Sequence, residues 1–203
     1  MRIVLAVLFT PFLALCAYAQ SDVPVVMRTF TVVSQFSLPP WSAHDNIGET
    51  SKIFRDQGKS ESGNDYFIHE MIPSDESFDA WTRLYAITAE TPISGDLQAY
   101  ANGQVNVYVR HCTNAASHFF PNIPEHAKLF LTFCEGYKNN PTVGEISVFN
   151  MQIKNETLVK NYINVRVPAF KLSDGALPLN DADFQTYVDL VWGLRLIDDS
   201  PGG

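Results

Sequence analysis

The sequence predicts an α+β protein: an antiparallel sheet that ends in a three-strand meander, with two or three helices packed on it. Two patterns lead to this prediction. Apolar and polar residues alternate in several segments, as in half-buried strands, and apolar residues recur three or four positions apart in others, as in helices. The expected order is two strands, two helices, three strands and a final helix, whose apolar stripes need a sheet face for burial.

The first part of the chain is expected to hold two strands and a long connection. Residues 28–38 alternate with a two-residue period until a double proline ends the strand. Residues 42–64 are rich in Gly, Ser, Asp and Lys, and they form the longest polar connection. Residues 66–72 are the second strand, which another proline stops.

Two helices are expected next. The first begins at Ser74 or Ser77, and its helically spaced apolar residues are Phe78, Trp81, Leu84 and Tyr85. The second runs from Ser94 or Asp96 to about His111, with a stripe of Leu97, Ala101, Val105, Tyr108 and Cys112. A strand remains the alternative over residues 105–109, because they alternate and Gly103 weakens a helix.

The second half of the chain is expected to form the meander. Residues 128–135 are a nearly continuous apolar run, typical of a central strand. Residues 145–154 and 158–170 flank Asn155-Glu156-Thr157, and we expect them to pair as a hairpin. In the first arm the apolar positions change phase near Phe149, which predicts a β-bulge.

The last helix has the clearest start signal. Asn180 is a good N-cap, Asp183 stands at the third helical position, and Leu179 and Phe184 can form a hydrophobic staple. One apolar stripe follows, made of Phe184, Tyr187, Val188, Val191 and Leu194. Residues 198–203 are expected to be a frayed tail.

The N-terminus is typical of a secretory signal. Arg2 precedes an apolar stretch over residues 3–15, and Ala17-Tyr18-Ala19 places small residues at the cleavage site. We therefore expect a signal peptide at residues 1–19, followed by a single α+β domain at residues 20–203 with frayed termini. The expected location is periplasmic or secreted, with no stable membrane span once the signal is removed. An uncleaved membrane anchor and a lipid anchor on Cys16 are the alternatives.

Two cysteines, Cys112 and Cys134, remain after the signal. An even pair in an exported protein predicts a disulfide, and closing its loop of 23 residues should stabilise the fold by roughly 3 kcal/mol. The alternative is a redox or nucleophilic thiol, but the chain has no C-x-x-C motif.

Strong catalytic motifs are absent from the sequence. Gly58-Lys59-Ser60 resembles the end of a phosphate-binding loop, but Ile53 replaces the glycine that should come five residues earlier. The net charge of −8 argues against a general nucleic-acid binder. No cofactor is expected.

Two weaker constellations could still carry chemistry. Neutral imidazoles gathered near the disulfide could hold zinc or copper, and the candidates are His111, His118 and His126. Glu135 and Glu145 border one turn and could act as an acid and a base. The alternative is that the three histidines are solvated or packed in the core, and that the two glutamates are solvated.

Trp41 is the tryptophan most suited to contact a ligand or a partner, because it follows the double proline instead of lying on a helix. Trp81 and Trp192 lie on or near predicted helical stripes, so we expect them to pack in the core.

Residues 73–84, PSDESFDAWTRL, come before the cysteine pair and a Gly144-Glu145 hairpin. This arrangement resembles small exported bacterial proteins of unassigned function. The closing Asp183-Phe184 helix after a meander resembles the Mog1, PsbP and DcrB group. That second resemblance implies an α/β/α sandwich with an accessory or binding role, and neither resemblance carries over a catalytic residue.

The expected function is that of an exported, non-enzymatic binding or accessory module of the cell envelope. Its partner would be an envelope protein or a small ligand, whose identity the sequence does not indicate. A metal-dependent or carboxylate-based hydrolase, built on the histidines or the two glutamates above, is the first alternative. A secreted, virulence-type factor is the second.

Overall fold

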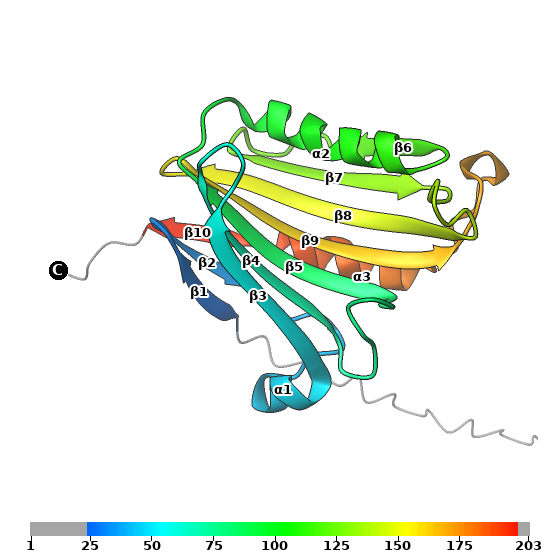
Figure 1. Cartoon of the computed structure of the whole chain (residues 1–203), viewed down its shortest axis with the longest axis horizontal. Helices are drawn as coiled ribbons and strands as arrows, with labels where there is room; N and C mark the ends of the chain where they lie inside the picture. The colour runs from blue at the N-terminus through cyan, green and yellow to red at the C-terminus, as the bar shows by residue number, and fades with distance from the viewer. Residues whose placement is uncertain (1–23, 199–203) are drawn as a thin grey trace, which may run out of the picture.

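The computed structural model describes residues 24–198, which form two antiparallel sheets with helices packed on the larger one (Figure 1). The large sheet has the strand order β3-β4-β5-β9-β8-β7-β6, and the small sheet has the order β1-β2-β10. The predicted α+β class is therefore confirmed. The signal-peptide prediction for residues 1–19 lies outside the described residues.

The strands of the large sheet are β3 (Ser51–Lys59), β4 (Asp65–Pro73), β5 (Arg83–Thr91), β6 (Ala115–Phe119), β7 (Ala127–Cys134), β8 (Val143–Lys154) and β9 (Thr157–Pro168). Those of the small sheet are β1 (Val25–Thr29), β2 (Val32–Phe36) and β10 (Arg195–Asp198). The helices are α1 (Ile47–Thr50), α2 (Leu97–His111) and α3 (Asp181–Trp192), with short 3-10 turns η1 (His44–Asn46) and η2 (Leu172–Asp174). None of the helices within residues 24–198 has the length and apolar content that a membrane crossing requires.

The main core lies between one face of the large sheet and a layer that consists of α3 and the small sheet (Figure 1). Phe36 of β2 and Val191 of α3 pack there with Ile163 of β9, and all three side chains are buried. On the opposite face of the sheet, α2 lies over β6, β7 and β8. Its buried residues Leu97 and Tyr108 form a second core with aromatic residues of these strands.

Helix α2 settles the helix-or-strand alternative in favour of the helix. The Asp96 side chain accepts a hydrogen bond from the Ala99 backbone N–H at 2.8 Å, which satisfies one of the free donors at the helix start. At the other end, Cys112 and Cys134 form a disulfide with an S–S distance of 2.10 Å. The bridge connects the end of α2 to the last residue of β7.

Helix α3 begins as predicted, because the Asn180 side chain accepts from the Asp183 backbone N–H at 2.9 Å. At the other end, side-chain amides of the large sheet donate to backbone carbonyls. Asn150 donates to Val191 O at 3.0 Å, Asn161 donates to the same oxygen at 3.3 Å, and Gln152 donates to Leu194 O at 3.1 Å.

The β-bulge predicted near Phe149 is wrong, and the side-chain amides of Asn150 and Gln152 explain why the sequence pattern suggested it. Every residue of β8 from Val143 to Lys154 pairs in continuous register with β9. Both faces of β8 are covered, one by α2 and the other by α3, so apolar side chains occur on both. The phase changes because Asn150 and Gln152 take inward positions beneath the end of α3.

The predicted first strand, residues 28–38, is also wrong: this region holds two strands joined by a turn. Thr29 pairs with Val32, so Phe30 and Thr31 form the turn, and Phe30 has a φ of 54°. Inward positions are odd-numbered in β1 and even-numbered in β2. The turn contains no glycine that would indicate it in the sequence. The apolar residues at even-numbered positions continue across the turn, so the segment resembles one longer strand.

The helix predicted from Ser74 or Ser77 is absent from the described structure, where residues 74–82 form turns and β5 follows. Leu84 and Ala86 face one side of the sheet while Tyr85 and Ile87 face the other, and all four are buried. Burial on both faces removes the two-residue period that would have indicated a strand.

Two further strands lie where polar segments were expected. β3 occupies part of the predicted connection over residues 42–64, and its mostly exposed side chains explain the polar composition of an edge strand. β10 pairs with β2, so Asp198, the first residue of the predicted frayed tail, belongs to a strand. The strands predicted over residues 66–72 and 128–135 and the hairpin around Asn155 and Glu156 are confirmed, with positive φ at both turn residues.

Candidate functional site

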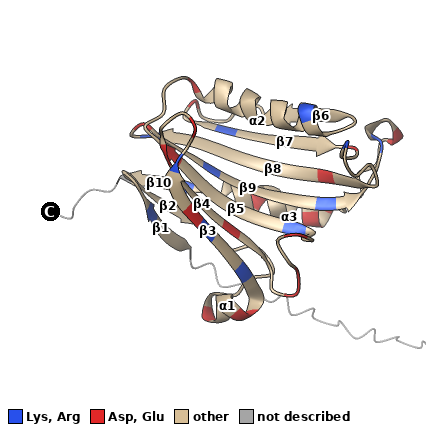
Figure 2. Ribbon diagram, in the orientation of Figure 1, with Lys and Arg blue, Asp and Glu red and all other residues tan. Residues whose placement is uncertain are grey.

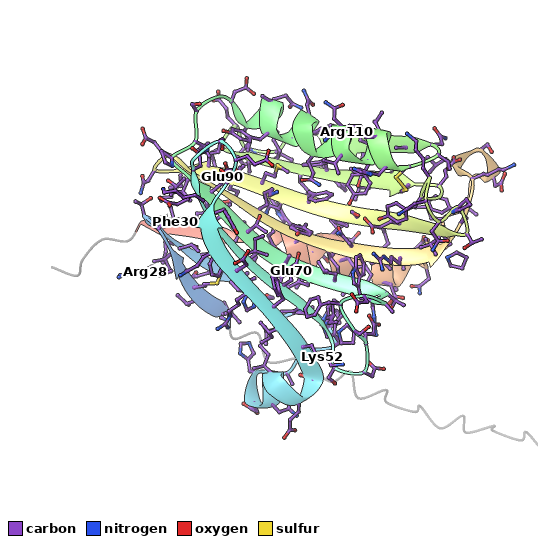
Figure 3. All side chains as sticks on the ribbon, viewed as in Figure 1. Arg28, Phe30, Lys52, Glu70, Glu90 and Arg110 are labelled. Carbon is purple, nitrogen blue, oxygen red and sulfur yellow. A yellow bond between two sulfur atoms is a disulfide. The ribbon has the colours of Figure 1, made fainter. Side chains whose placement is uncertain are left out.

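Helix α2 covers only the β6, β7 and β8 part of its face of the large sheet. Within the described chain, no helix covers the rest of this face, which belongs to β3, β4, β5 and β9 (Figure 1). We call this surface the open face. Along β9 the residues that point to it are Lys160, Tyr162, Asn164 and Arg166, and they alternate with residues of the main core. Figure 2 shows residues of both charges on the strands of the open face, and Figure 3 shows Glu70 in the middle of it.

Three cavities follow β9 along the open face. The first, of about 760 Å³, lies at the Arg166 end and is lined also by Trp81 and Tyr137. The second, of about 390 Å³, is lined by apolar and polar residues, namely Phe54, Glu70, Phe78, Trp81, Leu84, Tyr162 and Asn164. The third, of about 220 Å³, lies around Lys160. Trp81 borders the first two cavities and Tyr162 the last two, so the cavities adjoin.

At the first cavity, the Arg166 guanidinium lies over an aromatic ring. Its guanidinium carbon lies 3.7 Å from the centre of the Trp81 ring, and Nη1 donates to Trp81 O at 3.4 Å. Among the residues that the structure describes, no carboxylate lies within ion-pairing distance of Arg166, and its buried Nε has no hydrogen-bond partner.

Behind Tyr137 lies a buried carboxylate, that of Glu145, which is only 2% exposed. It accepts hydrogen bonds from the hydroxyls of Tyr108 at 2.8 Å, of Ser147 at 3.0 Å and of Tyr137. Burial, and then the Glu145 charge, raise the pKa values of both tyrosines far above the ordinary range. Both hydroxyls therefore stay protonated and remain donors to this carboxylate.

The second cavity combines exposed aromatic rings with a carboxyl group. Phe54 and Phe78 are 44% and 36% exposed, and their rings meet edge to face with centres 5.9 Å apart. Glu70 and Tyr162 both line this cavity. Burial raises the pKa of Glu70, and burial together with Glu70 raises the pKa of Tyr162.

The third cavity contains an amine in a partly apolar setting. Burial lowers the pKa of Lys160, although the nearby Glu90 charge acts in the opposite direction. Glu90 itself accepts a hydrogen bond from the Asn64 amide at 2.8 Å. The open face thus carries one cation at each end of its β9 row.

The three histidines predicted as metal candidates lie on separate exposed elements. His111 ends α2, His118 lies on β6 with its ring 5.5 Å from that of Phe120, and His126 precedes β7. Within residues 24–198, no group of three His, Cys, Asp or Glu side chains is placed to hold a metal ion.

The structure does not bring Glu135 and Glu145 together as an acid and base pair. Glu135 accepts from the Leu172 backbone N–H at 2.9 Å, whereas the partners of Glu145 are the three hydroxyls. Trp41, the predicted contact residue, is half-buried against the main core, with the Arg83 guanidinium 5.3 Å from its ring centre.

The residues that line the open face were not predicted as a site. Trp81 was expected in a helical core, yet it stacks on an arginine 85 positions further along the chain. One signal was present in the sequence: four consecutive outward positions of the second hairpin arm are polar or aromatic, as expected of a strand face that no helix covers.

No family model matches the chain, and no curated protein matches its sequence. Among solved structures, the Saccharomyces cerevisiae Ran-binding protein Mog1p is similar with a TM-score of 0.47 and 11% identity, over 72% of this chain and 97% of that one. A mutant of protein Mog1 is similar with a TM-score of 0.51 and 13% identity, over 87% and 97%. At 13% identity this second likeness shows the fold alone, and it confirms the resemblance to Mog1 at that level.

Proposed function

We propose that the chain is an exported, non-enzymatic binding module of the cell envelope, and that the open face is its binding surface. The observation that carries this proposal is the row of three adjoining cavities on a sheet face that no described helix covers. The two larger cavities have volumes in the range of ligand sites.

The side chains of this face suit recognition. Exposed aromatic rings such as Phe54 and Phe78 gain free energy when a partner covers them. Beside them, Arg166, Glu70 and Asn164 offer polar groups in fixed positions that can orient a bound molecule. An apolar floor with a few convergent polar groups is the usual composition of a binding site.

Export is supported by two features of the sequence. Residues 1–19 have the composition and the small-x-small ending of a cleaved signal, and the two cysteines left after cleavage form a pair. The partner is then an envelope protein or a small molecule of that compartment.

Site-specific photocrosslinking tests the proposal. Phe54→p-benzoylphenylalanine places a crosslinker on the open face, and Val109→p-benzoylphenylalanine places one on an exposed position of α2 as the matched control. After irradiation in intact cells, the Phe54 variant should give a specific adduct that the Val109 variant lacks. Equal adducts from both positions, or none from Phe54, would contradict binding at the open face.

A further inference from the structure

We infer that the open face binds an extended, apolar peptide segment whose carboxylate is received by Arg166. This inference rests on the proposed function, because it assigns the chemistry of the molecule that the open face would bind. The shared chemistry is a carboxylate next to apolar side chains, and it can come from a chain terminus or from an aspartate side chain.

The first step is the position of the arginine. Two described cations have acidic partners: Lys59 lies 2.8 Å from Asp65, and Arg83 lies 3.8 Å from Glu76. Arg166 has no such partner among residues 24–198, although it lines the largest cavity of the open face. Its planar fork of donors, fixed on the Trp81 ring, matches the two oxygens of a carboxylate.

The buried Glu145 does not take the place of that ligand. It lies opposite Arg166 in the β8–β9 register, but its oxygens accept from three hydroxyl groups. Tyr137 lines the same cavity as Arg166, and its hydroxyl donates to Glu145. No hydrogen bond or ion pair joins Glu145 to Arg166 among the described residues, so Glu145 does not occupy the guanidinium donors.

The second step is the shape of the surface. From Arg166 to Lys160 the strand advances six residues, or about 20 Å at the usual rise of an extended chain. The adjoining cavities follow this line, which suits an extended peptide better than a compact molecule. Next to Arg166, the second cavity offers Phe78, Trp81 and Leu84 to an apolar side chain.

Acidic groups on the same surface restrict the peptide further. Asp79 lines the first cavity, and Glu70 and Glu90 lie along the second and third. Additional carboxylates beyond the one at Arg166 would meet like charges, so we expect one acidic group at one end of an otherwise apolar segment.

Three six-residue peptides of alanine and phenylalanine test this inference: one with a free C-terminal carboxylate, one amidated, and one amidated with an aspartate at its last position. Isothermal titration should show that at least one acidic peptide binds tenfold or more tightly than the plain amide. Arg166→Gln should remove that advantage, and Arg166→Lys should remove part of it. Arg110→Gln, on the exposed side of α2 (Figure 3), makes the same charge change and should leave binding unchanged.

Circular dichroism and thermal unfolding verify that the Arg166 variants are folded. If Arg166→Gln does not fold, Arg166→Lys still provides the test. Equal binding of acidic and amidated peptides, or an unchanged advantage in both Arg166 variants, would overturn the inference. Acetate that binds as tightly as the peptides would do so too, because the site would then hold any small anion.

The outcomes separate this inference from the proposed function. A specific Phe54 adduct in cells, together with peptide binding that does not depend on Arg166, would support the proposed binding surface and contradict the role of Arg166 in binding a carboxylate. Peptide binding that requires both the carboxylate and Arg166, without a Phe54 adduct, would support the role of Arg166. It would contradict the binding role of the aromatic part of the open face.

Discussion

Glu145 and His69 are two buried titratable side chains with different hydrogen-bond partners. Glu145 is buried, and three hydroxyl donors replace the water that its carboxyl group loses. His69 of β4 is equally buried, but its Nδ1 accepts from the Arg55 guanidinium at 2.9 Å. Burial, and then the Arg55 charge, lower the pKa of His69 to about 4.

His69 should therefore make stability depend on pH below neutrality. The unfolded chain binds a proton on this histidine near pH 6.5, whereas the folded chain resists it until about pH 4. The contribution of His69 to the free energy of unfolding is fully present above pH 6.5 and is lost as the pH falls toward 4. Its total is on the order of 2–3 kcal/mol. Urea unfolding of wild type and His69→Gln from pH 7 to pH 4 measures it, and the variant should lose less stability on acidification.

His118→Gln, which removes an exposed imidazole on β6, is the matched control. Glu70 acts in the opposite direction, because its raised folded pKa favours the folded state at low pH. The comparison with His69→Gln removes this shared contribution. Parallel curves for wild type and His69→Gln would contradict the role assigned to the histidine.

At the level of elements, helix α3 depends on the sheet beneath it. Val191 near its end and Leu194 just after it are buried, and amides from β8 and β9 donate to their backbone carbonyls. A buried acceptor that loses its partner costs free energy, because water cannot replace the bond. The polar residues in the apolar strand β8 thus have a structural reason.

Asn150→Leu should lower the free energy of unfolding by about 1 kcal/mol, since it removes the shortest of these bonds while Val191 O keeps the bond from Asn161. Urea unfolding measures the loss, and hydrogen exchange should show weaker protection in the last turn of α3. Asn102→Leu, at an exposed position of α2, is the matched control and should change stability little. A variant as stable as wild type at position 150 would show that the amide is dispensable.

The elements that the sequence predicted correctly have a signal within a few residues. The Asp96 and Asn180 caps mark the two long helices, and the two-residue turn at Asn155 and Glu156 marks the hairpin. The elements that were missed lack such a signal. β5 is apolar on both faces, β3 is polar because it is an edge strand, and the β1–β2 turn uses Phe30 at positive φ without a glycine.

The candidate site was harder to predict than the fold because it depends on distant residues. The second hairpin arm showed an outward face of Lys160, Tyr162, Asn164 and Arg166, and this part was visible in the alternation. That Trp81 would stack on Arg166 follows only from strand order, which places β5 beside β9. Trp41 follows a double proline, a pattern that gives no information on the core packing that half-buries it.

At the scale of the whole molecule, the disulfide connects the two layers of the second core. Cys112 follows α2 and Cys134 ends β7, so the bridge fixes the helix over the sheet half that it covers. This arrangement also limits how far α2 can shift toward the open face. Since the bond needs an oxidising compartment, its formation depends on the export proposed above.

The material that cells export should therefore have the intact mass of residues 20–203 less two hydrogen atoms. It should show no reactive thiol after denaturation and two after reduction, because cleavage before Gln20 also removes Cys16. Ala19→Arg puts a large charged side chain at the cleavage site and should leave residues 1–19 attached, which adds their mass. Wild-type chains that begin at Met1 and show free thiols before reduction would contradict both cleavage and oxidation, and with them the envelope location.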